Sequence, residues 1–229
     1  MCAGSFLLML KIIVLKDFLW LVSLKNEDVI LARLVGHVFG DGHIHIHKYY
    51  FVYVNSEGAL LERVKKYIEK VFGCVKVNLG SSIGGVPRLQ FSNIVGKHLS
   101  FLGAPVGSKI RSPTSIPKWI ETGSEEVIIA FLSSLVDDEF SLRKYDATIK
   151  VEKLASLINE LKYYLLSLKK LFKEIGIEVS EPHSDQEKMK ANGEKVISMR
   201  IWITGRHNLR KLKKLDIVHP RKKEIIISY

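Results

Sequence analysis

Two stretches of the chain, LVGHVFGDG (34–42) and LSSLVDDEF (132–140), decide the fold because they are two copies of one pattern. Each is an apolar run that ends in an acid, and Asp41 of the first copy aligns with Glu139 of the second. An apolar run of this kind predicts a helix that buries one face. The repeat therefore predicts that the chain is built from two similar halves.

Two further matches follow in the same order in both halves. The segment around Gly73 (EKVFGCVKV) is similar to the segment around Gly176 (FKEIGIEV), and LGAPVGSK (102–109) is similar to LDIVHPRK (215–222). Alternating β-branched and aromatic residues between them predict strand pairs, while the intervening amphipathic segments predict helices. Each half is thus expected to follow the order α-β-β-α-β-β-α, an α+β fold with antiparallel sheets.

These patterns also set the expected boundaries. The first hairpin is expected over 42–55 with a break near Lys48, and the last one over 177–184 and 195–205. Long helices are expected over 57–72 and 154–175, and the β-prone tail HPRKKEIIISY has no predicted position. The four parts are an apolar N-terminal extension (1–25), the first half (26–105), a linker (106–123) and the second half with its basic tail (124–229).

The composition describes a globular protein with a surplus of positive charge. The 229 residues are 47% hydrophobic and 26% charged, with a net charge of +11. The surplus is +8 in residues 1–120 (15 basic, 7 acidic) and +3 in 121–229 (20 basic, 17 acidic), so it is spread over both halves. Such a charge favours a polyanionic partner. Because Cys2 and Cys74 are the only cysteines, a disulfide framework is excluded and a cytoplasmic location is expected.

The N-terminal extension is apolar but is not expected to cross a membrane. Lys11, Lys16 and Asp17 interrupt it, so no uncharged stretch approaches the roughly 18 to 20 residues that a spanning helix needs. We expect a helix that packs on the body of the protein. Attachment to a membrane surface is the less favoured alternative.

Acids at the ends of two predicted helices point to a bound cation. The helix dipole disfavours negative charge at a helix C-terminus by about 0.3 to 1 kcal/mol per site. A hard cation such as Mg²⁺ offsets this cost, because it prefers carboxylate and carbonyl oxygens. Small residues in both motifs would let the helices approach closely and bring Asp41 beside Glu139; these are Gly36, Gly40, Ser133 and Ser134. Lys109 and Lys222, at matching positions, would supply positive charge to a reacting phosphate.

The paired motifs resemble the two signature motifs of the LAGLIDADG homing endonucleases, and LGAPVGSKIRSPTSIPKWI (102–120) resembles the junction between the halves in archaeal intron- or intein-encoded members. The similarity covers about residues 26–225. It implies a monomer whose two sheets form a saddle over double-stranded DNA. It also implies cleavage across the minor groove of a long asymmetric site, with short 3′ overhangs and a divalent metal, Mg²⁺ or Mn²⁺.

The resemblance also assigns roles to residues. The predicted metal-binding residues are the acids Asp41 and Glu139, together with Gly40 and Asp138 beside them. Lys109 and Lys222 match the central lysines, and Asn55 matches a polar residue that positions water. Asp137 falls at a motif position that is more often structural, although Asp137 and Asp138 could be alternative ligands. The sequence departs from the family at Phe140, where glycine is usual. In the second half Asn55 has no clear counterpart, although Lys150 or Lys153 lies nearby.

A set of polar side chains on the predicted strands, the linker and a hairpin tip is expected to contact DNA. His43, His45 and His47 alternate along a predicted strand and could bind a transition metal, but contact with bases or phosphates is favoured. The other predicted DNA contacts are Arg88, Gln90, Arg111, Arg143, Lys150, Lys188, Lys190, Arg200 and Trp202. The expected function is Mg²⁺-dependent, sequence-specific DNA cleavage by a monomer. The alternatives are an RNA maturase or a non-cleaving DNA-binding protein on the same scaffold.

Overall fold

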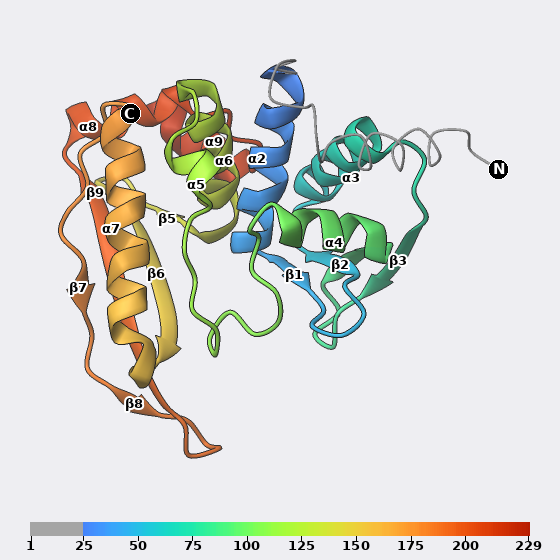
Figure 1. Cartoon of the computed structure of the whole chain (residues 1–229). Helices are drawn as coiled ribbons and strands as arrows, with labels where there is room; N and C mark the ends of the chain where they lie inside the picture. The colour runs from blue at the N-terminus through green and yellow to red at the C-terminus, as the bar shows by residue number, and fades with distance from the viewer. Residues whose placement is uncertain (1–24) are drawn as a thin grey trace.

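The computed structural model describes residues 25–229, and the expectations for the N-terminal extension lie outside this range. The first half has the predicted order of elements (Figure 1). These are α2 (Lys25–Phe39), β1 (Gly42–Ile44), β2 (Phe51–Val54), α3 (Gly58–Phe72), β3 (Val77–Ser81), β4 (Pro87–Phe91) and α4 (Asn93–Phe101). The strands form one antiparallel sheet in the order β1-β2-β4-β3.

The second half repeats this plan with additions. After the short helix α5 (Lys118–Glu121), it contains α6 (Glu125–Glu139), β5 (Ser141–Leu142), β6 (Asp146–Leu154), the 3₁₀ turn η1 (Ala155–Leu157), α7 (Ile158–Glu174), β7 (His183–Ser184), β8 (Lys188–Met189), β9 (Lys195–Thr204), α8 (Arg206–Arg210), η2 (Lys211–Lys214) and α9 (Pro220–Ser228). Its antiparallel sheet has the order β5-β6-β9-β7, and β8 also pairs with β9. The predicted α+β class with antiparallel sheets is confirmed.

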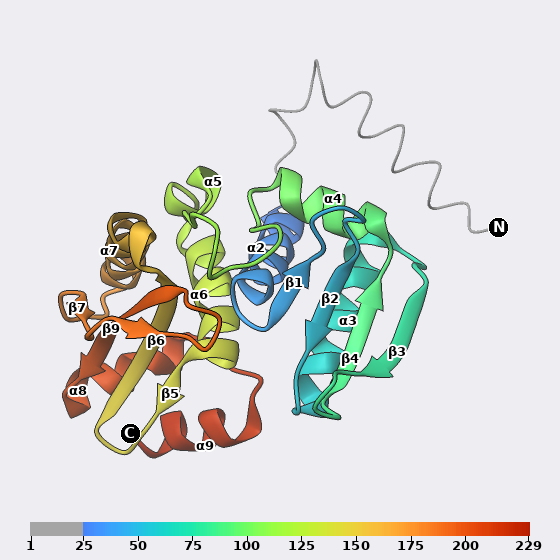
Figure 2. The same cartoon turned by 90° about the horizontal axis from the view of Figure 1, so that it is seen from below.

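Each sheet has one face covered by helices. In α3 the buried residues Leu60, Val64, Ile68 and Phe72 recur every four positions and form a stripe. In the second half Ile149 of β6 pairs with Ile201 of β9, and both are fully buried on the side of α7. Because side chains alternate along a strand, polar residues lie on the opposite face of each sheet. Figure 2 shows the two sheets on either side of the central helices α2 and α6.

Helices α2 and α6 pack closely because small residues line their contact. A Cβ atom added to Gly36 would lie 2.7 Å from the carbonyl oxygen of Phe131, and one added to Gly40 would lie 2.4 Å from Cβ of Asp138. Ser134 lies in the same contact, 2.9 Å from a Cβ added to Gly36, while the equally buried Ser133 accepts the backbone N–H of Asp216. The close approach predicted from the motifs is therefore present, and it brings the C-terminal ends of α2 and α6 together.

Three local features differ from the expectations or add to them: two predicted strands were wrong, and the tail, for which no position was predicted, forms a helix. Strand β1 ends at Ile44, so His45 and His47 lie in a turn and not on the strand. The turn is held by local hydrogen bonds, in which Nδ1 of His45 accepts from the backbone N–H groups of His47 and Lys48, each at 3.2 Å. This bonding competes with the strand ladder and overrides the alternating pattern.

The other two differences lie in the second half. Residues 177–184, expected to form a full strand, contribute only β7, and β8 pairs with the other end of β9. The tail forms α9, since Pro220 in its first turn suits a helix start and Ile226 is buried, although its isoleucines are typical of strands. The described residues include no helix with the length and apolar character to cross a membrane.

Candidate active site

Two acids, one from each half, meet at the ends of the central helices. Asp41 lies two residues after the end of α2, and Glu139 is the last residue of α6. Loss of water around the carboxyl group, followed by the charges of Asp138 and Glu139, raises the pKa of Asp41 to about 7. The pKa of Glu139 is raised by burial and by Asp138. Carboxylates crowded in this way favour a bound cation, which would relieve their repulsion.

Two lysines occupy equivalent places around these acids. The ammonium group of Lys109, in the linker, donates to the carbonyl oxygens of Gly40, Phe39 (3.2 Å) and Val38 (3.4 Å) at the end of α2. The ammonium group of Lys222, in α9, donates to the carbonyls of Val136 (2.9 Å) and Asp137 (2.5 Å) near the end of α6. Each lysine thus satisfies free helix carbonyls and opposes the dipole that disfavours an acid there.

The lysines also change what the site offers to a metal. Burial lowers the pKa of Lys109 and of Lys222, and the surrounding acids act in the opposite direction. The carbonyl oxygen of Gly40, predicted as a metal ligand, is a hydrogen-bond acceptor of Lys109. Among residues 25–229, no three His, Cys, Asp or Glu side chains form a metal-binding cluster. The protein therefore offers the two carboxylates, while water and a phosphate would complete the coordination.

Asp138 belongs to a buried network that supports Asp41. Its Oδ1 accepts the hydroxyl of Tyr53 at 2.7 Å, and its Oδ2 lies 3.0 Å from Nδ1 of His37. The same Oδ2 accepts the backbone N–H of Asp41 at 3.2 Å. The side chains of Asp138 and His37 are 0% and 1% exposed. Asp138, which was predicted as a possible metal ligand, therefore bonds α6 to His37, Asp41 and Tyr53 of the first half.

Asn55, predicted to position water, lies directly beside Asp41. Its Nδ2 donates to Oδ2 of Asp41 at 2.8 Å and to the hydroxyl of Tyr53 at 3.3 Å. Its Oδ1 accepts the backbone N–H of Glu57 at 2.8 Å, which fixes the orientation of the amide. One edge of Asn55 is therefore held by the backbone, and the other faces the acid.

In the second half, strand register places Val151 at the position of Asn55. Lys153, two residues further on, has no recorded hydrogen bond to Glu139 among the described residues. Its buried ammonium group donates to the carbonyl of Lys109, to the hydroxyl of Thr114 and, at 2.8 Å, to the carbonyl of Ser112. Burial lowers the pKa of Lys153 to about 8. Lys153 therefore anchors the linker that carries Lys109, while Lys150, the other residue considered, pairs with Asp185 at 2.9 Å.

Asp137 holds the chain that precedes Lys222. Its carboxylate accepts the backbone N–H of Val218 at 3.0 and 3.1 Å and that of His219 at 2.9 Å. The side chain is buried, and burial raises its pKa to about 6. The second half thus uses this acid to position α9, and α9 positions the lysine.

Sequence reasoning missed the supporting residues His37 and Tyr53. Both lie in apolar runs, LVGHVFG and FVYV, where the pattern indicates only core. The one available signal was a polar group at a core position, because such a group needs a buried partner. That partner, Asp138, comes from the other half of the chain, so local patterns could not identify it.

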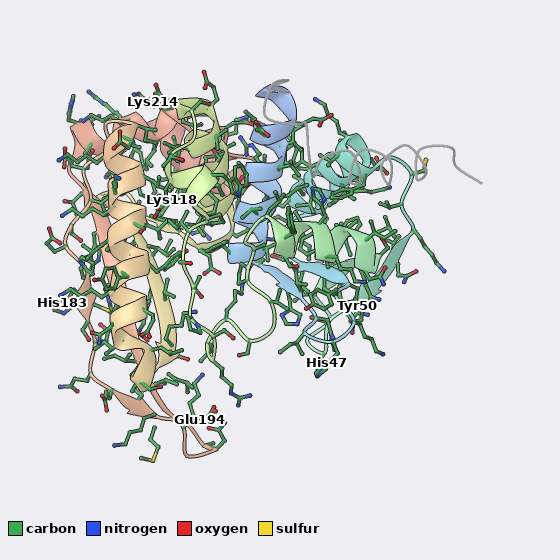
Figure 3. The ribbon with its side chains drawn as sticks, in the orientation of Figure 1. His47, Tyr50, Lys118, His183, Glu194 and Lys214 are labelled. Atoms are coloured by element: carbon green, nitrogen blue, oxygen red, sulfur yellow. The ribbon has the colours of Figure 1, made fainter. Side chains whose placement is uncertain are left out.

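The predicted DNA contacts divide by position. On the first sheet, Arg88 and Gln90 lie on the face opposite the helices, together with His43. On the second sheet, Lys150 is opposite Arg200, and Trp202 shares their face. The remaining residues lie outside β2, β4, β6 and β9: His47 (Figure 3) and His45 in the β1–β2 turn, Arg111 in the linker, Arg143 in the β5–β6 turn, Lys188 in β8 and Lys190 in the turn before β9.

Comparisons with known sequences give partial matches. A scan against models of protein families finds no match. The replication factor C small subunit of Methanocaldococcus jannaschii is 27% identical over 169 residues, which are 65% of this chain and 9% of that protein. The RNA polymerase subunit Rpo1N of the same organism is 24% identical over 230 residues, 87% of this chain and 16% of that protein. The chain therefore spans less than a fifth of either relative.

Solved structures match over most of the chain. A structure of mesophilic variants of the homing endonuclease I-DmoI has a TM-score of 0.55 at 14% identity, covering 83% of this chain and 96% of that one. An I-DmoI variant in complex with its target DNA and manganese also scores 0.55, at 14% identity and 85% and 98% coverage. Full-length WhiA from Thermatoga maritima scores 0.54 at 12% identity, with 91% and 61% coverage. The chain therefore has the fold of the LAGLIDADG homing endonuclease I-DmoI.

Proposed function

We propose that this protein is a metal-dependent, site-specific endonuclease that cuts both strands of a DNA duplex. The observation that carries the proposal is the pair Asp41 and Glu139, which crowd together at the ends of α2 and α6 with a lysine beside each helix end. Acids at two helix C-termini do not stabilise a structural core, because the helix dipole disfavours negative charge there. Metal-dependent hydrolysis of a phosphodiester, in contrast, uses such carboxylates to hold the metal ion.

The residues fit a divalent ion. Asp41 and Glu139 present hard oxygen ligands. Burial first, and then the charge of Asp138, raises the pKa of both, and a bound cation would offset the cost of ionising them there. When bound, Mg²⁺ or Mn²⁺ would polarise the phosphate and lower the pKa of a water molecule.

The protein's own groups would do the rest. Asn55 would orient the attacking water beside Asp41, to which it already donates at 2.8 Å. Lys109 and Lys222 would place positive charge near the phosphate as negative charge develops on it. The network of His37, Asp138 and Tyr53 would hold Asp41 in place, since it binds both the backbone N–H of Asp41 and its neighbour Asn55.

The DNA would lie against the polar faces of the two sheets. These faces carry Arg88, Gln90 and His43 on one side and Lys150, Arg200 and Trp202 on the other. The net charge of +11, spread over both halves, supports binding along a long duplex. Because one chain supplies both acids, we propose that it acts as a monomer on an asymmetric site. Cutting would occur across the minor groove and leave short 3′ overhangs.

The two relatives support a mobile origin. They have unrelated names, and this chain resembles only 9% and 16% of their lengths. A short segment shared by two unrelated proteins is what an inserted element would produce. We include in the proposal that the chain is encoded by an archaeal intron or intein.

The direct test is to incubate the protein and Mg²⁺ with a library of DNA duplexes that span candidate insertion sites, and to sequence the cut ends. We expect one long sequence family with staggered 3′ ends, and no cuts in the presence of a chelator. Tight binding to a duplex without cleavage would favour the alternative of a non-cleaving DNA-binding protein. Assisted splicing of an intron RNA without DNA cleavage would favour the maturase.

A further inference from the structure

The outer face of the second sheet carries carboxylates among the cations that were predicted to contact DNA. We call this set, Asp185, Glu152 and Glu194 with Lys150, Arg200, Lys190 and Arg111, the paired face. Lys190 lies 2.6 Å from Glu152, and Nε of Arg111 lies 2.9 Å from Glu194. Figure 3 labels Glu194 at the tip of the turn before β9, and His183 beside β9.

Asp185 is the residue of the paired face that makes the most bonds to cations. Its Oδ1 accepts Nη2 of Arg200 at 2.6 Å, its Oδ2 accepts the same nitrogen, and Nζ of Lys150 lies 2.9 Å from Oδ2. The register explains the contact, since Arg200 is opposite His183 on β7, and Asp185 lies two residues further along on the same face. The two cations lower the pKa of Asp185 to about 2, so it is ionised at neutral pH.

The bonds also fix where the guanidinium of Arg200 points. It lies 5.7 Å from the centre of the Trp202 ring, with Asp185 on Nη2. Among the described residues, Nε of Arg200 is buried without a hydrogen-bond partner and Nη1 has no recorded hydrogen bond, so Nη1 is the nitrogen left to donate to DNA. A guanidinium held in this way could donate to an acceptor on a base edge, such as O6 or N7 of guanine.

The first sheet has no such arrangement. Arg88, on its outer face, has no ion pair with any residue in the range 25–229, and its Nη2 would lie 3.4 Å from a Cβ added to Gly80. The difference agrees with the sequence, which carries +8 in residues 1–120 and +3 in 121–229. The second half has therefore placed negative charge on the surface where a polyanion would bind.

We propose that Asp185 determines specificity in the second half, by holding Arg200 and Lys150 for base contacts and repelling the backbone of unrelated DNA. The inference rests on the proposed function. A carboxylate close to the duplex weakens attraction to phosphates of any sequence. On the correct sequence, base contacts by the fixed Arg200 offset that loss. Removing the charge of Asp185 should therefore raise the affinity for unrelated DNA and lower the ratio of target affinity to unrelated affinity.

The test compares binding to the mapped target and to an unrelated duplex of equal length, by fluorescence anisotropy without divalent metal at several salt concentrations. For Asp185→Asn we expect affinity for unrelated DNA to rise about 10-fold, and its dependence on log salt to steepen by about 1. The ratio of target to unrelated affinity should fall about 10-fold. The control is Glu160→Gln, which removes an exposed charge from α7 on the other side of the sheet.

The outcomes separate the two proposals. An Asp185→Asn protein with the affinity ratio of Glu160→Gln would overturn the role of Asp185, while the nuclease proposal would stand. A wild-type protein that binds neither duplex would overturn the proposed function itself. Thermal unfolding checks that both variants fold. If Asp185→Asn does not, Glu152→Gln, which frees Lys190, should change the ratio in the same direction, and an unchanged ratio would overturn the inference.

Discussion

The two halves treat their acids differently. Beside Asp41, Asn55 donates to the carboxylate and Asp138 accepts the backbone N–H. For Glu139, no hydrogen bond to the carboxylate is recorded among residues 25–229. Val151 occupies the position of Asn55, and the nearby Lys153 binds the linker. Both halves nevertheless keep a lysine on the helix carbonyls. The duplication has thus retained the lysine caps at the helix ends, while the residues around the acids have diverged.

The largest effect should come from the feature that the halves share. Under the proposed function, Lys109→Met and Lys222→Met would each remove a positive charge near the scissile phosphate, so each should slow cleavage about 10²- to 10³-fold. Cleavage rates on the mapped target, at saturating protein, measure this. Lys118→Met is the matched control, since this exposed lysine pairs with Glu121 away from the acids. A large loss of cleavage rate in only one of the two variants would contradict the claim that the two lysines have equivalent roles.

The next effect should separate Lys153 from Asn55. Lys153→Met leaves two carbonyls and a hydroxyl in the linker without their donor, and unpaired buried acceptors cost roughly 1 to 3 kcal/mol each. We expect the free energy of unfolding to fall by about 3 kcal/mol, as measured by urea denaturation. Asn55→Ala should lower it by only about 1 kcal/mol. An equal fall in the free energy of unfolding for Lys153→Met and Asn55→Ala would contradict the proposed structural role of Lys153.

Much of this architecture was predictable because it is written in local patterns. The helix periodicity, the acids at the helix ends and the small residues at the contact predicted two packed helices with Asp41 and Glu139 at their ends. The turn at His45 was not predictable from alternation, because its side chain bonds to the backbone. Helix α9 was not predictable either, because its isoleucines favour a strand. It is a helix in the structure, with Ile226 buried.

The site was less predictable than the fold. The positions of His37, Tyr53 and Lys153 depend on partners in a different half or in the linker, so no local signal carries them. The ion pairs of the second sheet pose the same difficulty. The sequence predicted that Arg200 and Lys150 contact DNA, but in the structure both form ion pairs with Asp185.

A smaller effect should reveal the asymmetry in the reaction itself. Under the proposed function, Asn55→Ala removes the group that would orient water beside Asp41. Because no side chain in residues 25–229 is recorded as donating to Glu139, the substitution should slow cutting of one strand about 10-fold more than the other. Nicked DNA should then accumulate, as followed with a duplex labelled differently on each strand. Equal slowing of both strands would contradict the comparison.

The smallest effect concerns pH and stability. The pKa of Asp41 is about 7 in the folded protein against 3.8 for the free side chain, so the folded state holds the proton more tightly. The free energy of unfolding should therefore fall as pH rises from about 4 to 7. Asp41→Asn removes the part of this dependence that comes from Asp41, while Asp137 and Glu139, whose pKa values are also raised, keep theirs. Since solvent reaches Asp41 and screens its charge, we expect the variant to be more stable than wild type by about 1 kcal/mol at pH 8, with no gain at pH 4, in urea denaturation.

The most direct measurement of the central claim, that each half supplies one acid to a shared metal-dependent site, compares wild type with Asp41→Asn and Glu139→Gln on the mapped target in Mg²⁺. Binding to the same duplex in Ca²⁺ checks that each variant still recognises it. The account predicts that each substitution abolishes double-strand cleavage while the affinity stays within about threefold. Double-strand cleavage at the wild-type rate by either variant would contradict it.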